Sequence, residues 1–336
     1  MSSPLVVVDA DVLGRRRTGD ETYVENLLRA LPAAAPDLRL AALTRRPDLV
    51  PEGVEPVHLP AWSQELRMAV RVPLVLRRLR PAVVHFVHAL PPALPCPGVL
   101  TVQDLSFERD ASLMGRRETA IFRMVVPRSA RRAARVLAIS ERTKADLVEL
   151  YRLPPERVVV TLLGVDPAFR PGGTRSDYLL FAGAIEPRKD PLAAVEAARA
   201  VGRPLVAVGP ERDRALAAEL RARGADVRGY VPKDELVRLM QEAAALVFPT
   251  RHEGFGLPVA EAMACGTPVV ASPDPAVEEV GRDAIAYARP DELADVLRGV
   301  LADPGRWSRA GLERARSLTW ARAAEQTAAV YRAVLR

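Results

Sequence analysis

The stretch HEGFGLPVAEAMACGTPVVAS, His252 to Ser272, constrains this chain more than any other. Gly254 and Gly256 leave the backbone open to a ligand, and the proline that follows suits the first positions of a helix, where a missing N–H costs nothing. We predict a helix that begins near Leu257, ends at the Cys-Gly pair and leads into a short buried strand. Its free N–H groups and partial positive charge suit the hydroxyls and phosphates of a ligand.

Two carboxylates flank the start of this predicted helix. A carboxylate accepts two hydroxyl hydrogen bonds at once, so Glu253 in the loop suits the hydroxyls of a sugar. Glu261, eight residues later, suits a ribose diol at another depth of the same pocket. The alternative is that Glu253 caps the helix and Glu261 is a solvated helix residue. The surrounding residues favour the ligand-binding interpretation.

A second segment, FAGAIEPRKDP from Phe181 to Pro191, places a basic pair after a strand that ends in glycine. A basic pair after proline is most often a solvated turn. Here Arg188 and Lys189 lie between a predicted strand and a predicted helix, where two fixed cations suit a diphosphate. Such cations stabilise the negative charge that grows on a diphosphate leaving group.

Together the two segments resemble the E-G-F-G-L-P-x-x-E and G-x-x-E-P-R-K signatures of the large retaining glycosyltransferase family with the GT-B fold, group 1. This family includes bacterial mannosyl- and glucosyltransferases. The resemblance implies an α/β fold of two doubly wound Rossmann-like domains that face each other across a cleft. It implies transfer of a hexose, mannose or glucose, from a nucleoside-diphosphate sugar to an acceptor hydroxyl of a glycan, lipid or small molecule, with retention of configuration. By the same resemblance, Arg188, Lys189 and Glu253 are the catalytic residues, and neither a metal nor a cofactor besides the donor is needed.

The donor-binding residues are expected at the carboxyl ends of the strands of the second domain and in one loop of the first, because ligands of doubly wound sheets bind beyond those ends. These residues are Gly19, Gly183, Gly209, Val231, Gly254, Phe255, Gly256, Leu257 and Glu261.

The first half resembles the same family from Val8 to Leu28, with a first strand, a glycine-bearing loop and a helix. Gly19 is expected to let this loop approach the donor phosphates. Asp20-Glu21 stand where the family pattern has a small or apolar residue and a second glycine, and Gln103-Asp104 stand where it often has His-Asp. Because carboxylates repel a diphosphate, we expect Asp20 on the acceptor side with Gln103 and Asp104. For Asp20, the alternative of a helix N-cap stays open.

Two further positions depart from the family pattern. Ala184 stands where an arginine commonly follows the glycine at the strand end, which removes one phosphate contact, and Leu163 stands where an asparagine is common. In contrast, SERTKADL, Ser140 to Leu147, matches a helix start of the family.

Short β-branched runs alternate with helical patterns through both halves, which predicts two parallel sheets covered on both faces. The strands expected in the first half are Leu5–Asp9, Leu38–Leu43, Val54–Leu59, Val83–Val87, Val99–Val102, Val136–Ile139 and Val158–Leu162. Those expected in the second half are Tyr178–Phe181, Leu205–Val208, Val227–Val231, Leu246–Phe248, Pro268–Val270 and Ile285–Tyr287. A Pro- and Gly-rich connection from Gly164 to Thr174 separates the halves. We expect an acceptor-side domain over 1–168, a donor-binding domain over 169–318, and a final helix over 319–336 that, by resemblance, packs on the first domain.

The 336 residues suffice for two domains, and the formal net charge of +6 comes almost wholly from arginine, because only three lysines are present. Arginine favours phosphate partners, but nucleic acid is not expected, since the basic clusters lack interleaved aromatic residues. Cys96 and Cys265 lie far apart without disulfide or metal-ligand spacing, which favours a reducing cytoplasm. No apolar run approaches the roughly 20 residues of a bilayer span, so membrane contact is expected only at the surface, at the inner membrane face.

Two further segments have two interpretations each. Trp62 to Arg80 mixes apolar residues with five arginines in a helical pattern interrupted by Pro73; it either packs on its own domain or docks on an anionic membrane. Asp9-Ala10-Asp11 is a D-x-D, the metal signature of the other main glycosyltransferase fold. Its place at the end of the first strand, and the presence of Arg188 and Lys189, argue against a metal.

Two rival functions stay open. A GT-B epimerase or hydrolase would keep the nucleotide pocket but would release an isomer or free sugar without an acceptor. A non-catalytic nucleotide-binding module would bind without turnover. Against NAD, neither GRRRTG nor VGPERD supplies a G-x-G-x-x-G fingerprint.

Overall fold

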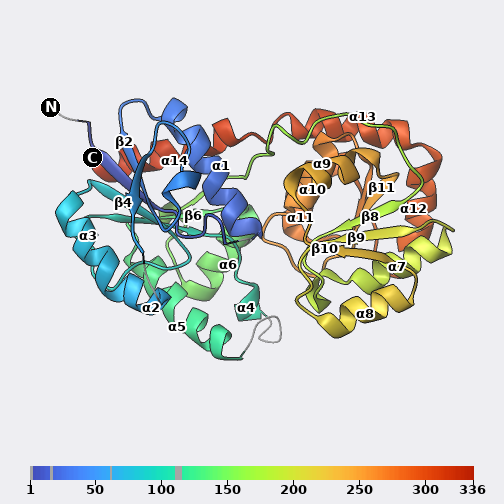
Figure 1. The fold of residues 1–336 in the computed structure, drawn as a ribbon, viewed down its shortest axis with the longest axis horizontal. Coiled ribbons are helices and arrows are strands. Elements are labelled where there is room, and N and C mark those ends of the chain that lie inside the picture. Colours follow the sequence, from blue (N-terminus) through green and yellow to red (C-terminus); the bar gives the residue numbers. More distant parts are fainter. Residues whose placement is uncertain (1–2, 16–17, 61–62, 110–115) are drawn as a thin grey trace. The chain divides into compact units, whose positions relative to one another are not determined.

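The computed structural model describes residues 3–15, 18–60, 63–109 and 116–336. The chain divides into two compact units (Figure 1). The first comprises Met1–Gly164 together with Trp320–Arg336, and the second comprises Val165–Thr319.

The first unit is built on a parallel sheet. Its strands are β1 (Leu5–Asp9), β2 (Arg39–Thr44), β3 (Glu55–His58), β4 (Val83–Val87), β5 (Gly98–Val102), β6 (Arg135–Ala138) and β7 (Val158–Val160). They lie in the order β3-β2-β1-β4-β5-β6-β7, and every neighbouring pair is parallel. The helices are α1 (Thr18–Ala34), α2 (Gln64–Leu66), α3 (Val72–Leu79), α4 (Ser106–Arg109), α5 (Arg116–Arg132), α6 (Glu141–Tyr151) and α14 (Trp320–Leu335). Short 3₁₀ turns at Pro47–Leu49 and Pro155–Arg157 lead into β3 and β7.

The second unit repeats this plan with a smaller sheet. Its strands are β8 (Leu179–Ala182), β9 (Leu205–Val208), β10 (Asp226–Gly229), β11 (Ala245–Phe248), β12 (Val269–Ala271) and β13 (Ala286–Tyr287), in the order β10-β9-β8-β11-β12-β13. Its helices are α7 (Pro191–Ala200), α8 (Arg214–Ala222), α9 (Lys233–Glu242), α10 (Leu257–Ala264), α11 (Pro275–Gly281), α12 (Leu293–Ala302) and α13 (Pro304–Ala315). Both units are doubly wound α/β domains, as the sequence predicts, and all thirteen predicted strands are present with ends shifted by a residue or two.

The boundary between the units differs from the expected one. It falls between Gly164 and Val165, not after residue 168. Val165 already belongs to the second unit because its N–H bonds to the carbonyl oxygen of Leu318 at 3.0 Å and it forms a parallel bridge with Thr319. The final helix expected over 319–336 is present as α14, which is separate from α13 and belongs to the first unit.

Helix α14 packs against α1 and is joined to the sheet through a buried polar network. The hydroxyl of Tyr331 lies 2.6 Å from Nδ1 of His85 on β4, and Nε2 of His85 lies 2.7 Å from Oγ1 of Thr101 on β5. Thr101 in turn lies 2.8 Å from the hydroxyl of Tyr23 on α1. Burial lowers the pKa of His85 to about 3, so its ring is neutral. The network connects the last helix to the centre of the first sheet.

We predict that His85 makes stability depend on pH. The folded-state pKa of about 3 lies below the unfolded value of 6.5, so the unfolded chain binds the proton first and stability falls as pH drops below 6.5. The slope from this one group is about 1.4 kcal/mol per pH unit. In His85→Gln, the free energy of unfolding measured in urea should fall less steeply between pH 7 and pH 5. The exposed His58→Gln serves as control, and equal slopes in all three proteins would refute the assignment.

Candidate donor site in the second unit

The predicted catalytic residues lie where the strand order of the second sheet reverses. The chain runs from β8 through β9 to β10 on one side, and from β11 through β12 to β13 on the other. The adjacent strands β8 and β11 therefore flank the topological switch point, where doubly wound sheets bind ligands beyond the carboxyl ends of their strands. The loop after β8 carries Arg188 and Lys189, and the loop after β11 carries Glu253.

Several bonds hold these two loops together. The N–H of Arg251 donates to the carbonyl oxygen of Arg188 at 2.9 Å, and the Arg251 guanidinium binds Oδ2 of Asp190 at 2.8 and 3.0 Å. In the other direction, Nη1 of Arg188 donates to the carbonyl oxygen of His252 at 2.8 Å. The loops after β8 and β11 therefore act as one platform.

At the centre of this platform, Lys189 and Glu253 form a buried ion pair. The residues are 9% and 7% exposed, and Nζ of Lys189 binds Oε1 of Glu253. The ammonium group also lies 5.5 Å from the centre of the Phe248 ring. Burial lowers the pKa of Lys189, and the Glu253 carboxylate opposes that shift. The pair therefore holds two opposite charges in a largely desolvated position.

Arg188 has a carboxylate partner of its own, which sequence reasoning did not assign. Its Nη2 lies 2.9 Å from Oε1 of Glu186, and Oε2 of the same carboxylate lies 3.4 Å from Nη1 of Arg212. Glu186 is 8% exposed. We call Glu186, Arg188, Lys189, Arg212 and Glu253 the platform cluster. It carries three cations and two carboxylates, so its formal charge is positive.

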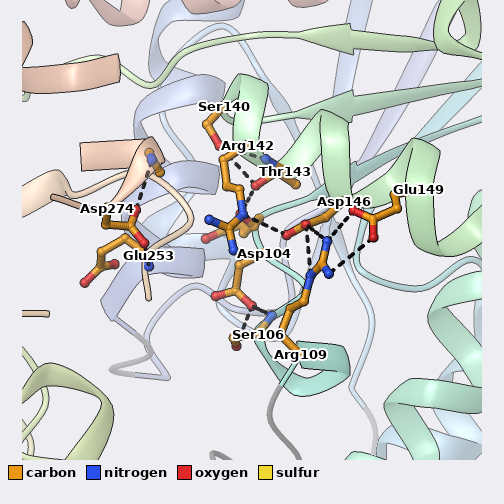
Figure 2. A network of polar contacts seen from close by, with 12 residues as sticks. Asp104, Ser106, Arg109, Ser140, Arg142, Thr143, Asp146, Glu149, Glu253 and Asp274 are labelled. Atoms are coloured by element: carbon orange, nitrogen blue, oxygen red, sulfur yellow. Dashed lines mark hydrogen bonds and ion pairs between the residues drawn. The ribbon is translucent and has the colours of Figure 1, made fainter. Parts of the chain in front are cut away.

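Asp274 holds the backbone of Glu253 in place, and sequence reasoning did not assign it. It caps α11, where its Oδ1 accepts from the N–H groups of Ala276 and Val277 at 2.9 and 3.4 Å. Its Oδ2 accepts from the N–H of Glu253 at 3.3 Å, as Figure 2 shows. Burial raises the pKa of Asp274, and the nearby Glu253 adds to the shift. The Asp-Pro dipeptide that begins α11 is a recognisable helix start, but it does not reveal the bond to a residue 21 positions away.

Helix α10 begins at Leu257, as predicted, and ends before Gly266, whose φ is +70°. Its N-cap is Gly256, with φ of 97° and no side-chain cap, so the alternative that Glu253 caps this helix is wrong. Phe255 is only 2% exposed, and its ring packs into the unit. Within the part of the chain that the structure describes, the N–H groups of Phe255, Gly256 and Leu257 have no recorded acceptor. The start of α10 thus leaves three backbone donors unbonded within the described residues.

Glu261 lies on α10 but is not a solvated helix residue, so that alternative is wrong as well. It is 9% exposed, and burial raises its pKa to about 7. The Asp166 carboxylate adds to this shift and Lys233 opposes it. Lys233 Nζ binds Oδ2 of Asp166 at 2.9 Å. Glu261 thus interacts electrostatically with Asp166 and Lys233, two residues that were not selected from the sequence.

The glycine that follows β9 is required by close backbone packing. Gly209 has φ of +139°, and a Cβ atom placed there would lie 1.9 Å from the carbonyl oxygen of Gly183. Gly183 itself follows β8 with φ of +157°. Val231, expected at the end of a strand, lies beyond it instead, because β10 ends at Gly229, where φ is +68° and the pairing with β9 shifts register.

Candidate acceptor residues in the first unit

Gly19 was expected in a loop, but it lies in the first turn of α1. A Cβ atom there would lie 3.4 Å from Oε1 of Gln103, so the glycine leaves room for that amide. Nε2 of Gln103 is buried, and the described residues offer it no hydrogen-bond partner.

Asp20 is not the N-cap of α1, because the helix begins at Thr18. The Oδ1 atom of Asp20 lies 3.1 Å from Nε2 of His88, which follows β4. His88 was not predicted from the sequence.

Asp104 helps to build the start of α4, which follows β5, and Ser140 caps the start of α6, which follows β6. Its Oδ1 accepts from the N–H and hydroxyl of Ser106 at 3.1 and 2.8 Å, at the start of α4. Ser140 caps α6 as predicted, accepting from the N–H of Thr143 at 3.1 Å. Figure 2 shows these caps with Arg109, whose Nη2 lies 2.7 Å from Oδ1 of Asp146. The carboxyl end of the first sheet is therefore polar and well ordered by hydrogen bonds.

The D-x-D carboxylates at the end of β1 are bound by arginines. Asp9 pairs with the fully buried Arg67, and Asp11 pairs with Arg45 at 2.7 Å and Arg15 at 2.9 Å. Within the described residues, no group of three or more His, Cys, Asp or Glu side chains is arranged to hold a metal ion.

Arg67 belongs to the arginine-rich segment Trp62 to Arg80, which the sequence left open to packing or membrane docking; Trp62 lies outside the described residues. A π-helical turn, Arg67–Arg71, joins α2 to α3, and Pro73 occupies the first positions of α3 without breaking the helix. One face packs on the unit through Val72, Pro73 and Leu76. The opposite face leaves three apolar side chains 45–50% exposed, and these are Leu66, Val70 and Leu74. Among the helices that the structure describes, none has the length and apolar character that a bilayer-spanning segment requires.

Similarity to known proteins

Two family models cover most of the chain. The model described as glycosyl transferases group 1 matches residues 176–303, and the model described as glycosyltransferase family 4 matches residues 17–169. The D-inositol 3-phosphate glycosyltransferase 1 of Catenulispora acidiphila is 31% identical over 281 residues, which cover 71% of this chain and 67% of that enzyme. The chain belongs to the group 1 glycosyltransferase family.

The O-antigen chain mannosyltransferase B of Escherichia coli is 29% identical over 228 residues, 59% of this chain and 60% of that enzyme. The chain thus spans about two thirds or less of the length of the curated relatives it matches.

Solved structures establish the fold of this family member. Sucrose-phosphate synthase from Thermosynechococcus elongatus has a TM-score of 0.80 at 19% identity, covering 98% of each chain. WaaG, a glycosyltransferase of lipopolysaccharide biosynthesis, has a TM-score of 0.73 at 20% identity, covering 97% of this chain and 99% of its own. Anabaena HepE in complex with UDP-glucose has a TM-score of 0.73 at 14% identity, covering 98% and 99%. The two units form a GT-B fold, which confirms the predicted fold class.

We predict that Glu261→Gln stabilises the ligand-free protein at alkaline pH. The folded pKa of about 7 exceeds the unfolded value of 4.5, so the native state binds more protons between these values and stability falls as pH rises from 4.5 through 7. Removing the charge should raise the free energy of unfolding at pH 8 by about 3 kcal/mol, and by little near pH 4.5. Urea unfolding at both pH values measures the difference, and a variant less stable than the parent at pH 8 would contradict the prediction.

We predict that Gly209→Ala destabilises the second unit by about 3 kcal/mol, because the added methyl group meets the Gly183 carbonyl. Gly202→Ala is the matched control: its φ is +69°, but nothing lies within 4 Å of the added atom. It should cost only about 1 kcal/mol, the strain of the backbone conformation. Thermal unfolding compares the two, and equal losses would show that packing against Gly183 is unimportant.

Proposed function

We propose that this protein is a retaining glycosyltransferase that moves a hexose, mannose or glucose, from a nucleoside-diphosphate sugar to an acceptor hydroxyl. The carrying observation is the buried Lys189–Glu253 pair, with Arg188 beside it, at the switch point of the second unit. Relatives named as a mannosyltransferase and as an inositol 3-phosphate glycosyltransferase support hexosyl transfer. A solved complex of the same fold with UDP-glucose supports a nucleotide-sugar donor.

The platform cluster suits the diphosphate of the donor. Arg188 and Lys189 are each bound to a carboxylate, and a diphosphate would exchange with Glu186 and Glu253 for their N–H donors. Each charge-assisted hydrogen bond gained contributes about 1.5–3 kcal/mol. The cations would stabilise the diphosphate most as its charge grows during departure, which lowers the barrier to transfer.

Glu253, once released from Lys189, would hold hydroxyls of the transferred sugar. The N–H groups of Phe255, Gly256 and Leu257 would bind the same ligand from the start of α10. The acceptor hydroxyl would attack the anomeric carbon from the face that the diphosphate leaves, and the departing phosphate oxygen would take its proton. The new glycosidic bond then replaces the anomeric carbon–phosphate bond with retention, without a protein nucleophile.

Glu261 would bind the ribose diol. Two hydroxyl donors stabilise the charged carboxylate and so lower a pKa that burial holds near 7. Gly183, Gly209 and Val231 stay proposed donor contacts, as does Gly19 in the first unit.

On the acceptor side, Nε2 of Gln103, which has no hydrogen-bond partner among the described residues, is a donor for a hydroxyl. Asp104 and Asp20 are further proposed contacts. We also propose peripheral contact with an anionic membrane through the exposed face of Leu66, Val70 and Leu74. The cytoplasmic location expected from the two cysteines stays a prediction.

The donor assignment predicts that Lys189→Met weakens UDP or GDP binding at least tenfold, about 1.4 kcal/mol, in calorimetry. Methionine keeps the side chain length but removes the charge. Glu261→Gln should weaken nucleotide binding to a similar extent, since the amide accepts fewer hydroxyl bonds. Lys144→Met, in the first unit, is the matched control and should bind as the parent does. Unchanged nucleotide binding in both site variants would reject the donor site.

The product formed distinguishes glycosyl transfer from the two rival functions, an epimerase or hydrolase and a non-catalytic binding module. The chain is first screened by thermal shift against UDP-, GDP-, ADP- and dTDP-sugars, and the stabilising donor is then incubated with hydroxyl acceptors. Mass spectrometry should find a glycosylated acceptor, and the coupling constant of its anomeric proton should match that of the donor. Free sugar or an isomer in the absence of acceptor would instead show a hydrolase or epimerase. Nucleotide binding without any product would show a binding module.

A further inference from the structure

The switch point of the first unit gathers three polar side chains, of which His88 was not predicted from the sequence. The chain leaves β1 toward β2 and β3 on one side, and leaves β4 toward β5, β6 and β7 on the other. Ligands of doubly wound sheets bind beyond the carboxyl ends of the strands at such a point. His88 directly follows β4, Gln103 directly follows β5, and Asp20 lies in the first turn of α1, the helix after β1. The segments that flank the switch point therefore carry all three side chains.

The backbone of His88 is strained. Its φ is +63°, in the left-handed range that residues other than glycine rarely adopt. Among the described residues, four others with a side chain have a positive φ, and each lies at an end of a helix, where this conformation is common. These are Arg80, Arg152, Asp190 and Arg282. His88 ends no helix, so its conformation has another cause.

Hydrogen bonds and ring packing hold His88 in this conformation. Its N–H donates to the carbonyl oxygen of Thr101 on β5 at 2.8 Å, and its ring lies against Phe122 with centroids 5.9 Å apart. Its Nε2 lies 3.1 Å from Oδ1 of Asp20. Because a carboxylate only accepts hydrogen bonds, Nε2 carries the hydrogen and donates it. The strained backbone thus directs the imidazole at Asp20 and fixes the position of that carboxylate.

Gln103 supplies a donor beside Asp20. Its main-chain carbonyl accepts from Oγ1 of Thr143 at 3.0 Å, which fixes the backbone. A Cβ atom added to Gly19 would lie 3.4 Å from Oε1 of Gln103, so the amide lies beside the residue that precedes Asp20. Nε2 of the amide is buried and has no hydrogen-bond partner among the described residues. Since a buried N–H without a partner is costly, this donor indicates a ligand atom that accepts from it.

We propose that Asp20 and Gln103 bind one hydroxyl group of the acceptor, and that His88 is the positioning residue that holds Asp20 for it. A hydroxyl group donates one hydrogen bond and accepts others, so it can donate to the carboxylate while it accepts from the amide. A phosphate group suits this site poorly, because the carboxylate repels its charge. The side chains of His88 and Asp20 are 20% and 29% exposed, so a ligand can reach them.

Given the proposed glycosyl transfer, on which this assignment rests, the chemical class of the acceptor follows. The attacking hydroxyl gives its proton to the departing phosphate oxygen, so the hydroxyl bound by Asp20 and Gln103 is a second one that does not react. The acceptor therefore carries at least two hydroxyl groups and no negative charge at the bound one. Saccharides and cyclitols have this chemistry, whereas simple alcohols and phosphate groups do not.

The first arm of the test observes His88 directly. The chain has four histidines, so isotope labelling of the imidazole nitrogens gives few NMR signals, and the signal missing from His88→Gln identifies His88. Titration of the full chain with methyl α-D-mannopyranoside, methyl α-D-glucopyranoside or myo-inositol should shift this signal to saturation with at least one compound. The signal of the exposed His58 should stay in place. No shift of the His88 signal with any of the three, or an equal shift of His58, would overturn the proposal.

Inorganic phosphate separates a hydroxyl site from an anion site. At the same pH and concentration, it should neither shift the His88 signal nor displace the bound compound. A shift or displacement by inorganic phosphate would show that the site takes an anion and would overturn the assignment to a neutral hydroxyl group.

The second arm changes the two ligand-binding groups one at a time. Gln103→Glu keeps the size of the side chain but replaces the donor by a carboxylate. In saturation-transfer NMR, it should bind the compound found above at least about tenfold more weakly. The exposed Gln64→Glu makes the same chemical change elsewhere in the first unit and should bind as the parent does. Equal losses in both variants, or no loss in Gln103→Glu, would overturn the proposal.

The role of His88 is tested by two substitutions that share the backbone strain, since neither introduces glycine. His88→Gln keeps an N–H donor for Asp20, whereas His88→Leu keeps much of the bulk without a donor. His88→Leu should weaken binding of the same compound at least about tenfold, and His88→Gln by less than about threefold. Equal losses would show that the ring only packs against Phe122 and would refute the positioning role.

The third arm keeps the donor site as an internal reference. Gln103→Glu should bind UDP or GDP as the parent does in calorimetry, so failure of the acceptor site and failure of the donor site are distinguishable. In transfer to the compound that binds, this variant should raise KM for the acceptor at least about tenfold with kcat little changed, because a hydroxyl that does not react is bound equally in the ground and transition states. A fall in kcat at unchanged KM would instead place Gln103 at the reacting atoms and overturn the proposal.

Discussion

The buried ion pair between Lys189 and Glu253 is the interaction on which the proposed donor site depends. Taking both charges out of water costs several kcal/mol per ion, and their attraction offsets this cost only in good geometry. The structure supplies that geometry by bonding the loops after β8 and β11 to each other and by holding the Glu253 backbone on Asp274. Loss of either partner would leave an unpaired buried charge. The site is thus ordered before any ligand arrives, which reduces the entropy lost on binding.

The same ordering leaves charges in positions that are unfavourable without a ligand. Glu261 is the clearest case, because burial and the Asp166 carboxylate raise its pKa to about 7. A group in such a position destabilises the empty fold when it ionises. Two hydroxyl donors would reverse this effect, so the stability that Glu261 removes from the free protein reappears as affinity for a diol. Stability and nucleotide binding are therefore expected to change in opposite directions at this residue.

The sequence predicted what local patterns determine. The β-branched runs located all thirteen strands because buried parallel strands must be apolar on both faces. The glycines before Leu257 and the proline after it located α10 because they favour a helix start. It did not predict contacts between distant positions. Glu186 with Arg212, Asp166 with Lys233, and Asp9 with Arg67 are each separated by 26 or more residues. Propensity also failed at the end of β10, where a positive φ at Gly229 ends the strand before Val231.

Two departures from the family pattern can be understood from these distant contacts. Ala184 removes an arginine next to the strand end, but Arg212, from the loop after β9, brings a second guanidinium to Glu186 besides that of Arg188. The platform cluster therefore keeps an excess of positive charge, with one guanidinium supplied from the loop after β9 and not from the position after Gly183. In the first unit, Asp20 and Glu21 add two carboxylates where the family has none. Asp20 lies 3.1 Å from His88 Nε2, and Glu21 accepts from the N–H of Gly14 at 2.6 Å. Because each extra carboxylate already has a hydrogen-bond partner, it repels a nearby anion less strongly. The two carboxylates therefore change the family pattern without excluding the proposed phosphate binding.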